Sequence, residues 1–292
     1  MSSHRSTTPL RTAVVGTGGI ARSSHLPALR ALADAGEVEI VAAVDVDMDA
    51  VRAFAAGAGI PHASTDLDAT LADLRPDLVV LCTPPAVHRD QAVTALKAGA
   101  WVWCEKPPCP SLADFDAIET AEKPGDAGPY AAIVFQHRFG SGARHVRRLL
   151  REGAFGRPLV AHCQTTWYRD AAYYSVPHLY GYRNADWRIT PAPGVPEETV
   201  AAWRDFGTDE PSSHLAQLRA LVADIRAGRR HATSGAGGRQ TLEFITALYK
   251  SAFTDAPVRA GEIGPGDPYY TELHGGAQGW APDTARKEEA HA

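Results

Sequence analysis

The chain has few cysteines, and their spacing matches no common cysteine-based site. Its 292 residues contain four of them, Cys82, Cys104, Cys109 and Cys163, with no CxxC pair. A disulfide-stabilised fold uses a denser set, and Cys104 and Cys109 lack the companion ligands of a zinc site. Cys82 and Cys104 lie in apolar runs, where a free thiol acts as a small hydrophobe. We therefore expect a reduced, cytoplasmic chain that binds no metal.

Long apolar runs and an excess of positive charge are missing as well. No window approaches ~18 uninterrupted apolar residues, and residues 1–12 lack the apolar core of a signal peptide. The formal net charge is −5, so no basic field attracts nucleic acid or an anionic membrane. A hydrophobic fraction of 45% and a charged fraction of 22% are typical of globular proteins. We expect one or two globular domains and neither a nucleic-acid nor a membrane partner.

Apolar runs of strand length alternate with helical patterns in the first half of the chain. Strands are predicted at residues 12–16, 39–45, 77–83, 101–105 and 130–136. Helices are predicted between them, at residues 19–36, 49–56, up to about residue 98, and at 111–122. Near-continuous apolar strands separated by helices indicate a parallel sheet covered on both faces. The pattern predicts an α/β fold with a doubly wound sheet over residues 10–136, after a disordered tail at residues 1–9.

The second half of the sequence follows a different pattern. Helices are predicted at 143–153, 212–228 and 239–253, and a long strand at 158–170. Prolines and glycines make the segment 177–196 irregular, and the end of the chain from residue 261 is loop-like. We expect residues 137–292 to form a second domain.

A glycine-rich turn joins the first predicted strand to the first predicted helix. GTGGIA (16–21) fits the pattern GxGxxA. Gly16 allows a tight turn, Gly18 lets the backbone approach a pyrophosphate, and Ala21 lets helix and strand pack closely. The helix N-terminus then offers unpaired N–H groups to phosphates, although the bare motif is often only a glycine turn. The predicted cofactor contacts in this turn are Gly16, Gly18, Gly19 and Ile20.

The second predicted strand ends in an acid, Asp45. It follows the glycine-rich turn at about the separation expected for the acid that binds the adenosine ribose 2′-hydroxyl. A carboxylate at this position repels a 2′-phosphate, so the sequence favours NAD over NADP. The alternative is that Asp45 only caps the end of its strand.

Two later strands end in proline-rich turns at the same predicted sheet edge. WVWC (101–104) runs into Glu105, Lys106 and two prolines, and the strand at 77–83 ends in TPPAVH (83–88). Proline fixes its own φ and biases the preceding residue toward extended geometry, so the ammonium of Lys106 is held in place. Ligands of open α/β sheets bind at the carboxyl ends of the strands. Lys106 is therefore a candidate for chemistry, the alternative being a surface lysine paired to Glu105.

Taken together, GTGGIA, Asp45, TPPAVH and CEKPP resemble the Gfo/Idh/MocA family of glucose–fructose oxidoreductase and inositol dehydrogenase relatives. The similarity runs from about Leu10 to Tyr174 and resumes in the last helices. It implies a Rossmann domain followed by an α/β (α+β) substrate domain with an open sheet, through which relatives commonly form oligomers. It also implies hydride transfer between NAD, or with less support NADP, and a CH–OH carbon of a sugar-like or polyol substrate.

The resemblance also implies roles for individual residues. Lys106 matches the lysine of the family's EKP motif, which hydrogen-bonds the reacting hydroxyl and helps its proton leave, and burial is expected to tune it for that task. Glu105 is expected to position Lys106 or to contact the cofactor ribose. His88 is as consistent with a structural hydrogen bond as with a cofactor contact, and Arg138 is expected to be structural. The cofactor-binding set therefore also includes Thr83, Pro84, His88, Glu105 and Lys106.

The second half departs from the family pattern. Relatives carry a glycine-rich segment and a helix with an Asp and a His that face the lysine, but here SVP (175–177) runs directly into HLYGYRNADWRI (178–189). We therefore expect a shortened second domain, by natural loss, a gene-model artefact or a deletion, and the second acid–base group is not located. The alternative function is a non-catalytic dinucleotide-binding protein. Possible substitutes outside any motif are Tyr168, Arg169, Asp170, His178, Asp186 and His214, although a lone histidine is more often packed or on the surface.

Overall fold

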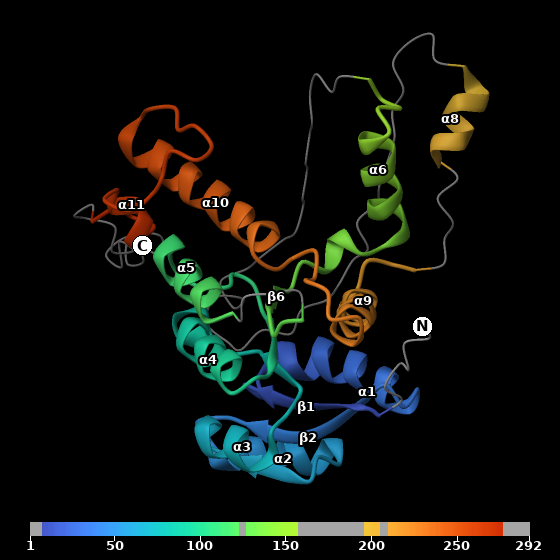
Figure 1. The fold of residues 1–292 in the computed structure, drawn as a ribbon, viewed down its shortest axis with the longest axis vertical. Helices are drawn as coiled ribbons and strands as arrows, with labels where there is room; N and C mark the ends of the chain where they lie inside the picture. The colour runs from blue at the N-terminus through green and yellow to red at the C-terminus, as the bar shows by residue number, and fades with distance from the viewer. Residues whose placement is uncertain (1–7, 123–126, 157–195, 205–209, 277–292) are drawn as a thin grey trace, which may run out of the picture.

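The core of the molecule is one parallel sheet. The computed structural model describes residues 8–122, 127–156, 196–204 and 210–276 (Figure 1). In this part of the chain six strands pair in the order β3-β2-β1-β4-β5-β6, and every pairing is parallel. The order reverses direction between β1 and β4, which is the Rossmann arrangement. The strands are β1 (Leu10–Val15), β2 (Val38–Val44), β3 (His62–Ser64), β4 (Leu78–Leu81), β5 (Trp101–Cys104) and β6 (Ala131–Ile133).

Helices connect the strands and continue beyond the last one. Those of the first half are the π-helix η1 (Ala21–His25), α1 (Leu26–Asp34), α2 (Met48–Ala58), α3 (Leu67–Leu74), α4 (Pro85–Lys97) and α5 (Leu112–Ala121). After β6 come the 3-10 helix η2 (Gln136–Arg138), α6 (Ser141–Arg151), α8 (Glu197–Arg204), α9 (His214–Arg226), α10 (Ala236–Thr254) and α11 (Pro268–Thr271). Within the described ranges, no helix has both the length and the hydropathy needed to cross a membrane.

Strand alternation divides the core into two layers. In β4, Leu78 and Val80 face the layer that contains α1, α2 and α9, whereas Val79 and Leu81 face α4, α5 and α10. Successive side chains of a strand point to opposite faces, so an all-apolar strand needs helices on both sides. Figure 1 shows α4 and α5 on one side of the sheet and α1 and α9 on the other. The predicted doubly wound sheet is confirmed.

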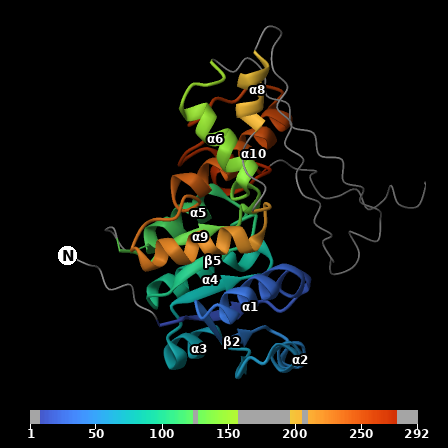
Figure 2. The same cartoon turned by 90° about the vertical axis from the view of Figure 1, so that its right-hand side faces the viewer.

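One helix from the far half of the sequence completes the Rossmann layer. On α9, Leu218, Leu221 and Val222 are buried in the same core as Leu29 and Leu32 of α1. Figure 2 shows α9 lying beside α1 and above the sheet. The hydroxyl of Ser213 caps α9 by accepting the N–H of Ala216 at 3.0 Å. The domain boundary after residue 136 stays a prediction, and among the described elements α9, α10 and α11 pack across it.

Several elements differ from the sequence prediction. The pair β3 and α3 was not predicted, because the three residues of β3 (HAS) show no apolar run and form an edge strand. The last strand ends at Ile133 rather than residue 136, where η2 begins. The turn α11 lies in the tail predicted to be loop-like. The predicted strand at 158–170 lies outside the described residues.

Candidate functional site

Gly16 and Gly18 of the turn after β1 serve different purposes: the first is required by the backbone, and the second leaves open space. Gly16 has φ +87°, and a Cβ there would lie 2.8 Å from the carbonyl carbon of Cys82 and 2.9 Å from the nitrogen of Thr83. Only glycine tolerates this backbone and this close approach of the β4 end. A Cβ on Gly18 would meet no atom within 4 Å. The turn therefore leaves open space in front of Gly18, next to the start of a helix whose first N–H groups lack intrahelical acceptors.

This geometry fits the pyrophosphate of a dinucleotide. The switch point of the sheet lies between β1 and β4, where ligands of open α/β sheets bind. Ala21 at the start of η1 is fully buried, so a larger residue would separate helix from sheet. The three features that the motif requires, a tight turn, an open approach and a small packing residue, are present together.

Asp45 at the end of β2 is tied to the same turn. Its Oδ2 accepts the N–H of Thr17 at 2.6 Å and the hydroxyl of Thr17 at 2.8 Å. Burial by itself raises the pKa of Asp45, but these hydrogen bonds bring the pKa below its ordinary value. Oδ1 has a longer bond from the N–H of Asp47, at 3.3 Å. Asp45 therefore shapes the turn as an anion, and Oδ1 is the oxygen with more capacity left for a ligand hydroxyl.

The turn after β4 is held by side chains of α4. The hydroxyl of Thr83 donates to Oε1 of Gln91 at 2.6 Å, and Pro84 precedes the first residue of α4. His88 is fully buried, with Nε2 2.7 Å from the carbonyl of Thr83 and Nδ1 3.1 Å from that of Pro107. Burial lowers the pKa of His88 despite these contacts, so the neutral ring donates to one carbonyl at a time. Of the two roles left open for His88, the geometry supports the structural one, a link between two loops.

Lys106 extends from the end of β5 toward solvent. Its side chain is 43% exposed, and its Nζ lies 3.8 Å from Oε2 of Glu105. The expected burial of Lys106 is therefore not seen among the described residues. The backbone N–H of Lys106 also donates to Oε2 of Glu105, at 3.1 Å. The chain thus presents an accessible ammonium beside a buried carboxylate.

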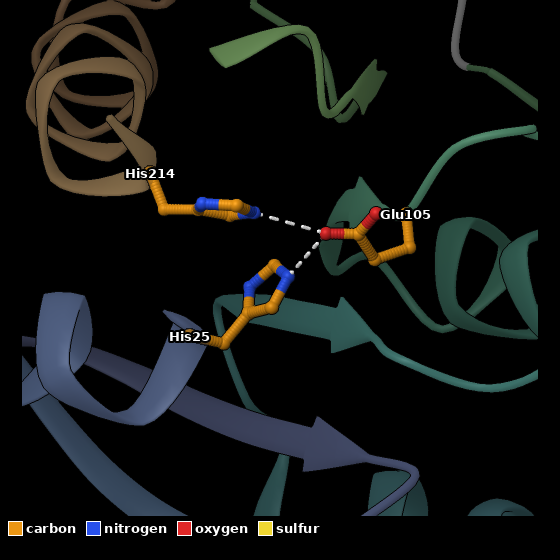
Figure 3. Close-up of side chains that lie close together, drawn as sticks. All are labelled: His25, Glu105 and His214. Atoms are coloured by element: carbon orange, nitrogen blue, oxygen red, sulfur yellow. Dashed lines mark hydrogen bonds and ion pairs between the residues drawn. The ribbon is translucent and has the colours of Figure 1, made fainter. Parts of the chain in front are cut away.

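Glu105 lies in a buried cluster with two histidines, which Figure 3 shows converging on one carboxylate oxygen. Nε2 of His25, from η1, lies 2.8 Å from Oε1, and Nε2 of His214, the first residue of α9, lies 3.1 Å from it. His25 is 0% exposed and His214 is 4% exposed. The His25 ring stands edge-on to Trp103, with ring centroids 4.6 Å apart, and edge-on to His214, at 4.9 Å.

The histidines, rather than the lysine, fix the charge state of Glu105. Burial by itself raises the pKa of Glu105, but hydrogen bonds from His214 and His25, with the charge of Lys106, bring it well below its ordinary value. A hydrogen bond to a buried charged group stabilises by about 1.5–3 kcal/mol. An ion pair with a partly exposed lysine contributes only about 0–1 kcal/mol. The carboxylate is therefore held mainly from its histidine side.

The same three residues have the donor types of a zinc site. Their ligand atoms all lie within 4.8 Å of one another, and two imidazoles with one carboxylate are a common zinc set. A metal on Nε2 of His25 would leave the ring's proton on Nδ1, and that buried atom has no hydrogen-bond partner among the described residues. Metal-ligating histidines almost always donate this second N–H to an acceptor. The geometry therefore fits a hydrogen-bonded cluster better than a metal centre.

The predicted cofactor contacts and the predicted lysine lie at one edge of the sheet. The predicted contacts in the turn at 16–20, Asp45, the end of β4 and Lys106 all lie near the carboxyl edge of the sheet. The sequence does not predict His25, and it offers His214 only as one possible substitute for the second acid–base group. No local sequence pattern singles out either histidine. Arg138 is structural as predicted, because its guanidinium donates to the carbonyl of Gly237 at 3.1 Å and to the hydroxyl of Thr241 at 2.7 Å. Outside the described residues lie Cys163, Tyr168, Arg169, Asp170, His178 and Asp186.

The first half of the chain matches a family of known proteins. Residues 10–127 match the family described as "Oxidoreductase family, NAD-binding Rossmann fold". D-glucoside 3-dehydrogenase of Escherichia coli is 30% identical over 160 residues, which are 55% of this chain and 44% of that protein. Inositol 2-dehydrogenase 3 of Saccharopolyspora erythraea is 30% identical over 154 residues, 53% of this chain and 44% of the relative. The matches thus span less than half the length of these relatives.

Solved structures give the same picture of partial similarity. The WlbA dehydrogenase from Bordetella pertussis, in complex with NADH and UDP-GlcNAcA, is 27% identical with a TM-score of 0.45. The match covers 51% of this chain and 44% of that one. The range of residues 10–127 that matches the family includes the glycine-rich turn, Asp45 and Lys106. Residues 10–127 of this chain therefore match, and are similar in sequence to, the NAD-binding Rossmann fold of the Gfo/Idh/MocA oxidoreductase family.

Proposed function

We propose that the chain is an NAD-dependent dehydrogenase acting on a CH–OH carbon of a sugar-like or polyol substrate. The observation that carries the proposal is the meeting of three features at one sheet edge. These are the open turn at Gly18, the ionised carboxylate of Asp45 and the exposed ammonium of Lys106. The names of the relatives, a glucoside dehydrogenase and an inositol dehydrogenase, support the substrate class.

The cofactor is held by backbone and by one acid. The N–H groups after Gly18 bind the pyrophosphate, and Oδ1 of Asp45 accepts a ribose hydroxyl. The charge of Asp45 opposes a second negative group at the same place, so NAD binds more tightly than NADP. When bound, NAD accepts a hydride from the substrate carbon.

Lys106 handles the proton of the substrate hydroxyl. Its ammonium donates a hydrogen bond to the reacting oxygen, and in the deprotonated form Nζ takes up the proton as the C–H bond breaks. Glu105 is the counter-charge of the ammonium, at 3.8 Å. This half of the molecule therefore contributes two groups to the reaction: Nζ of Lys106, which accepts the proton, and the carboxylate of Glu105, which is its counter-charge.

The test separates cofactor binding from turnover. NADH and NADPH are titrated while energy transfer from protein tryptophan to the reduced nicotinamide is recorded, since Trp103 of β5 packs against His25 in the cluster around Glu105. We expect saturable binding with a Kd at least about tenfold lower for NADH, a difference of about 1.4 kcal/mol. No saturable binding would refute the cofactor site.

Turnover is then screened with polyols and sugars by the absorbance of NADH. Lys106→Ala should bind NADH within about twofold of the unmodified chain and lose turnover by about a hundredfold or more, which is the usual effect of general acid–base groups. Lys97→Ala is the matched control, because Lys97 is an exposed lysine at the end of α4. Binding without turnover on any substrate would favour the alternative, a non-catalytic dinucleotide-binding protein.

A further inference from the structure

The buried cluster around Glu105 connects three distant parts of the chain. His25 is the last residue of η1, Glu105 directly follows β5, and His214 begins α9, 109 residues further along the chain (Figure 3). An ionised carboxylate has no proton to donate, so each histidine must present an N–H on Nε2. Burial lowers the pKa of His214, with a smaller opposing effect of the bond to Glu105, so its ring donates in the neutral form.

The two carboxylate oxygens have separate partners. Oε1 accepts from both histidines, whereas Oε2 accepts the backbone N–H of Lys106 and lies 3.8 Å from its Nζ. A carboxylate held by two donors on one oxygen cannot rotate without losing them. The orientation of Oε2 toward Lys106 is therefore set from the opposite side of the group.

We propose that His214 is a positioning residue, whose Nε2–H fixes the Glu105 carboxylate and thereby holds the ammonium of Lys106 at the cofactor edge. The site lysine is then coupled to α9, a helix that packs on α1 through Leu218, Leu221 and Val222. This inference concerns the proposed dehydrogenase site and rests on the proposed function, because positioning Lys106 matters only if the lysine takes part in the reaction. Its tests require neither cofactor nor substrate.

The first test measures the tautomer of His214 in the unmodified protein. Long-range ¹H–¹⁵N NMR spectra of ¹⁵N-histidine-labelled protein at pH about 7.5, where the free imidazole is neutral, distinguish the ring forms. We expect a protonated Nε2 and an unprotonated Nδ1 for His214, assigned by loss of its signal in His214→Gln. The opposite tautomer, or an imidazolium, would overturn the proposal without reliance on any variant's stability.

The second test follows the Glu105 carboxyl by ¹³C NMR of δ-labelled glutamate, assigned with Glu105→Gln. In His214→Leu the Glu105 titration should move up by at least about one pH unit, a tenfold change in proton affinity. His214→Gln retains an N–H donor and should keep the titration close to that of the unmodified chain. His231→Leu is the control, because it removes a buried histidine from Asp224, 2.8 Å away, at the other end of α9.

The third test asks whether the effect reaches the lysine. Competitive acetylation with mass-spectrometric readout compares Lys106 with Lys97 in one sample. We expect about a threefold faster reaction of Lys106 in His214→Leu, as befits loss of a partly exposed ion pair, and no change in His214→Gln or His231→Leu. An unchanged Glu105 titration or Lys106 rate in His214→Leu, or a folded His214→Gln that behaves like it, would overturn the proposal. A chain that passes these tests but binds no NADH would refute the proposed function alone.

Discussion

Gly16→Ala and Gly18→Ala are expected to separate the folding role of the glycine-rich turn from its binding role. A Cβ on Gly16 would come within 2.9 Å of three backbone atoms of Cys82 and Thr83. These atoms continue β4, a central strand whose Cys82 N–H donates to the carbonyl of Val15 at 2.7 Å. The clash cannot be relieved by turning a flexible side chain, so β1 and β4 must shift apart.

The size of the effect follows from two costs. Alanine in the left-handed region costs about 1–2 kcal/mol. Crowding a methyl group into packed atoms costs about 1–3 kcal/mol more. Together, Gly16→Ala should lower the free energy of unfolding by about 2–5 kcal/mol, or the Tm by about 5–15 °C for a protein of this size. Gly18→Ala meets open space and should change stability by no more than about 0.5 kcal/mol.

The assay combines thermal unfolding, followed by circular dichroism, with the NADH titration. Gly18→Ala should unfold with the Tm of the unmodified chain and bind NADH at least about tenfold more weakly, because the methyl group occupies the space in front of the turn. A Gly16→Ala variant as stable as the unmodified chain would refute the account of the turn. Normal NADH binding by Gly18→Ala would show that the pyrophosphate does not approach this glycine.

Three further predictions concern charge and thiol chemistry. Asp45→Asn should lower the preference for NADH over NADPH to less than about threefold, because the charge that opposes a 2′-phosphate is gone; an unchanged ratio in the two titrations would contradict this. The free energy of unfolding should fall as the pH drops from about 6.5 to 5, because the unfolded chain takes up protons on histidines whose pKa is lowered by burial in the folded chain. Each such histidine contributes a loss of up to about 1.4 kcal/mol per pH unit. Equal urea midpoints at both pH values would refute this prediction. Glu119 and Glu122, whose pKa values are raised by burial, oppose this trend, but these two glutamates are outnumbered by the four histidines. Burial also raises the pKa of Cys109 to about 12, so peptide mapping after iodoacetamide treatment at about pH 8.5 should find Cys109 modified only in unfolded protein; labelling of the native chain would show that the thiol is accessible.

Much of the first half was predictable because its signals are local. Four-residue apolar strands such as β4 and β5 must be buried on both faces, and the helices between them supply the covering layers. The turn at Gly16 and the acid at Asp45 have fixed positions relative to the strands before them. The end of β5 places Lys106 at the carboxyl edge for the same reason. Short edge elements such as β3 carried no apolar pattern and were missed.

Other features depended on packing between distant segments. The hydroxyl of Thr83 is used by Gln91, and both ring nitrogens of His88 face carbonyl groups, which no motif indicates. The expected burial of Lys106 was wrong for the described chain, because the lysine extends past the end of its strand while Glu105 turns inward. Sequence spacing gives the position of a residue along a strand but not the direction of a side chain in the turn that follows.

The sequence by itself determined the parallel sheet, the glycine-rich turn and the place of Lys106, because hydrophobic periodicity and turn chemistry act over a few residues. Only the tertiary structure decided what surrounds that lysine. His25 and His214 reach Glu105 from positions 80 and 109 residues away, and the strength of their hydrogen bonds comes from the burial that all three share. Burial of this kind is a property of the packed core, where α9 closes over the sheet, and no single segment of the chain carries it.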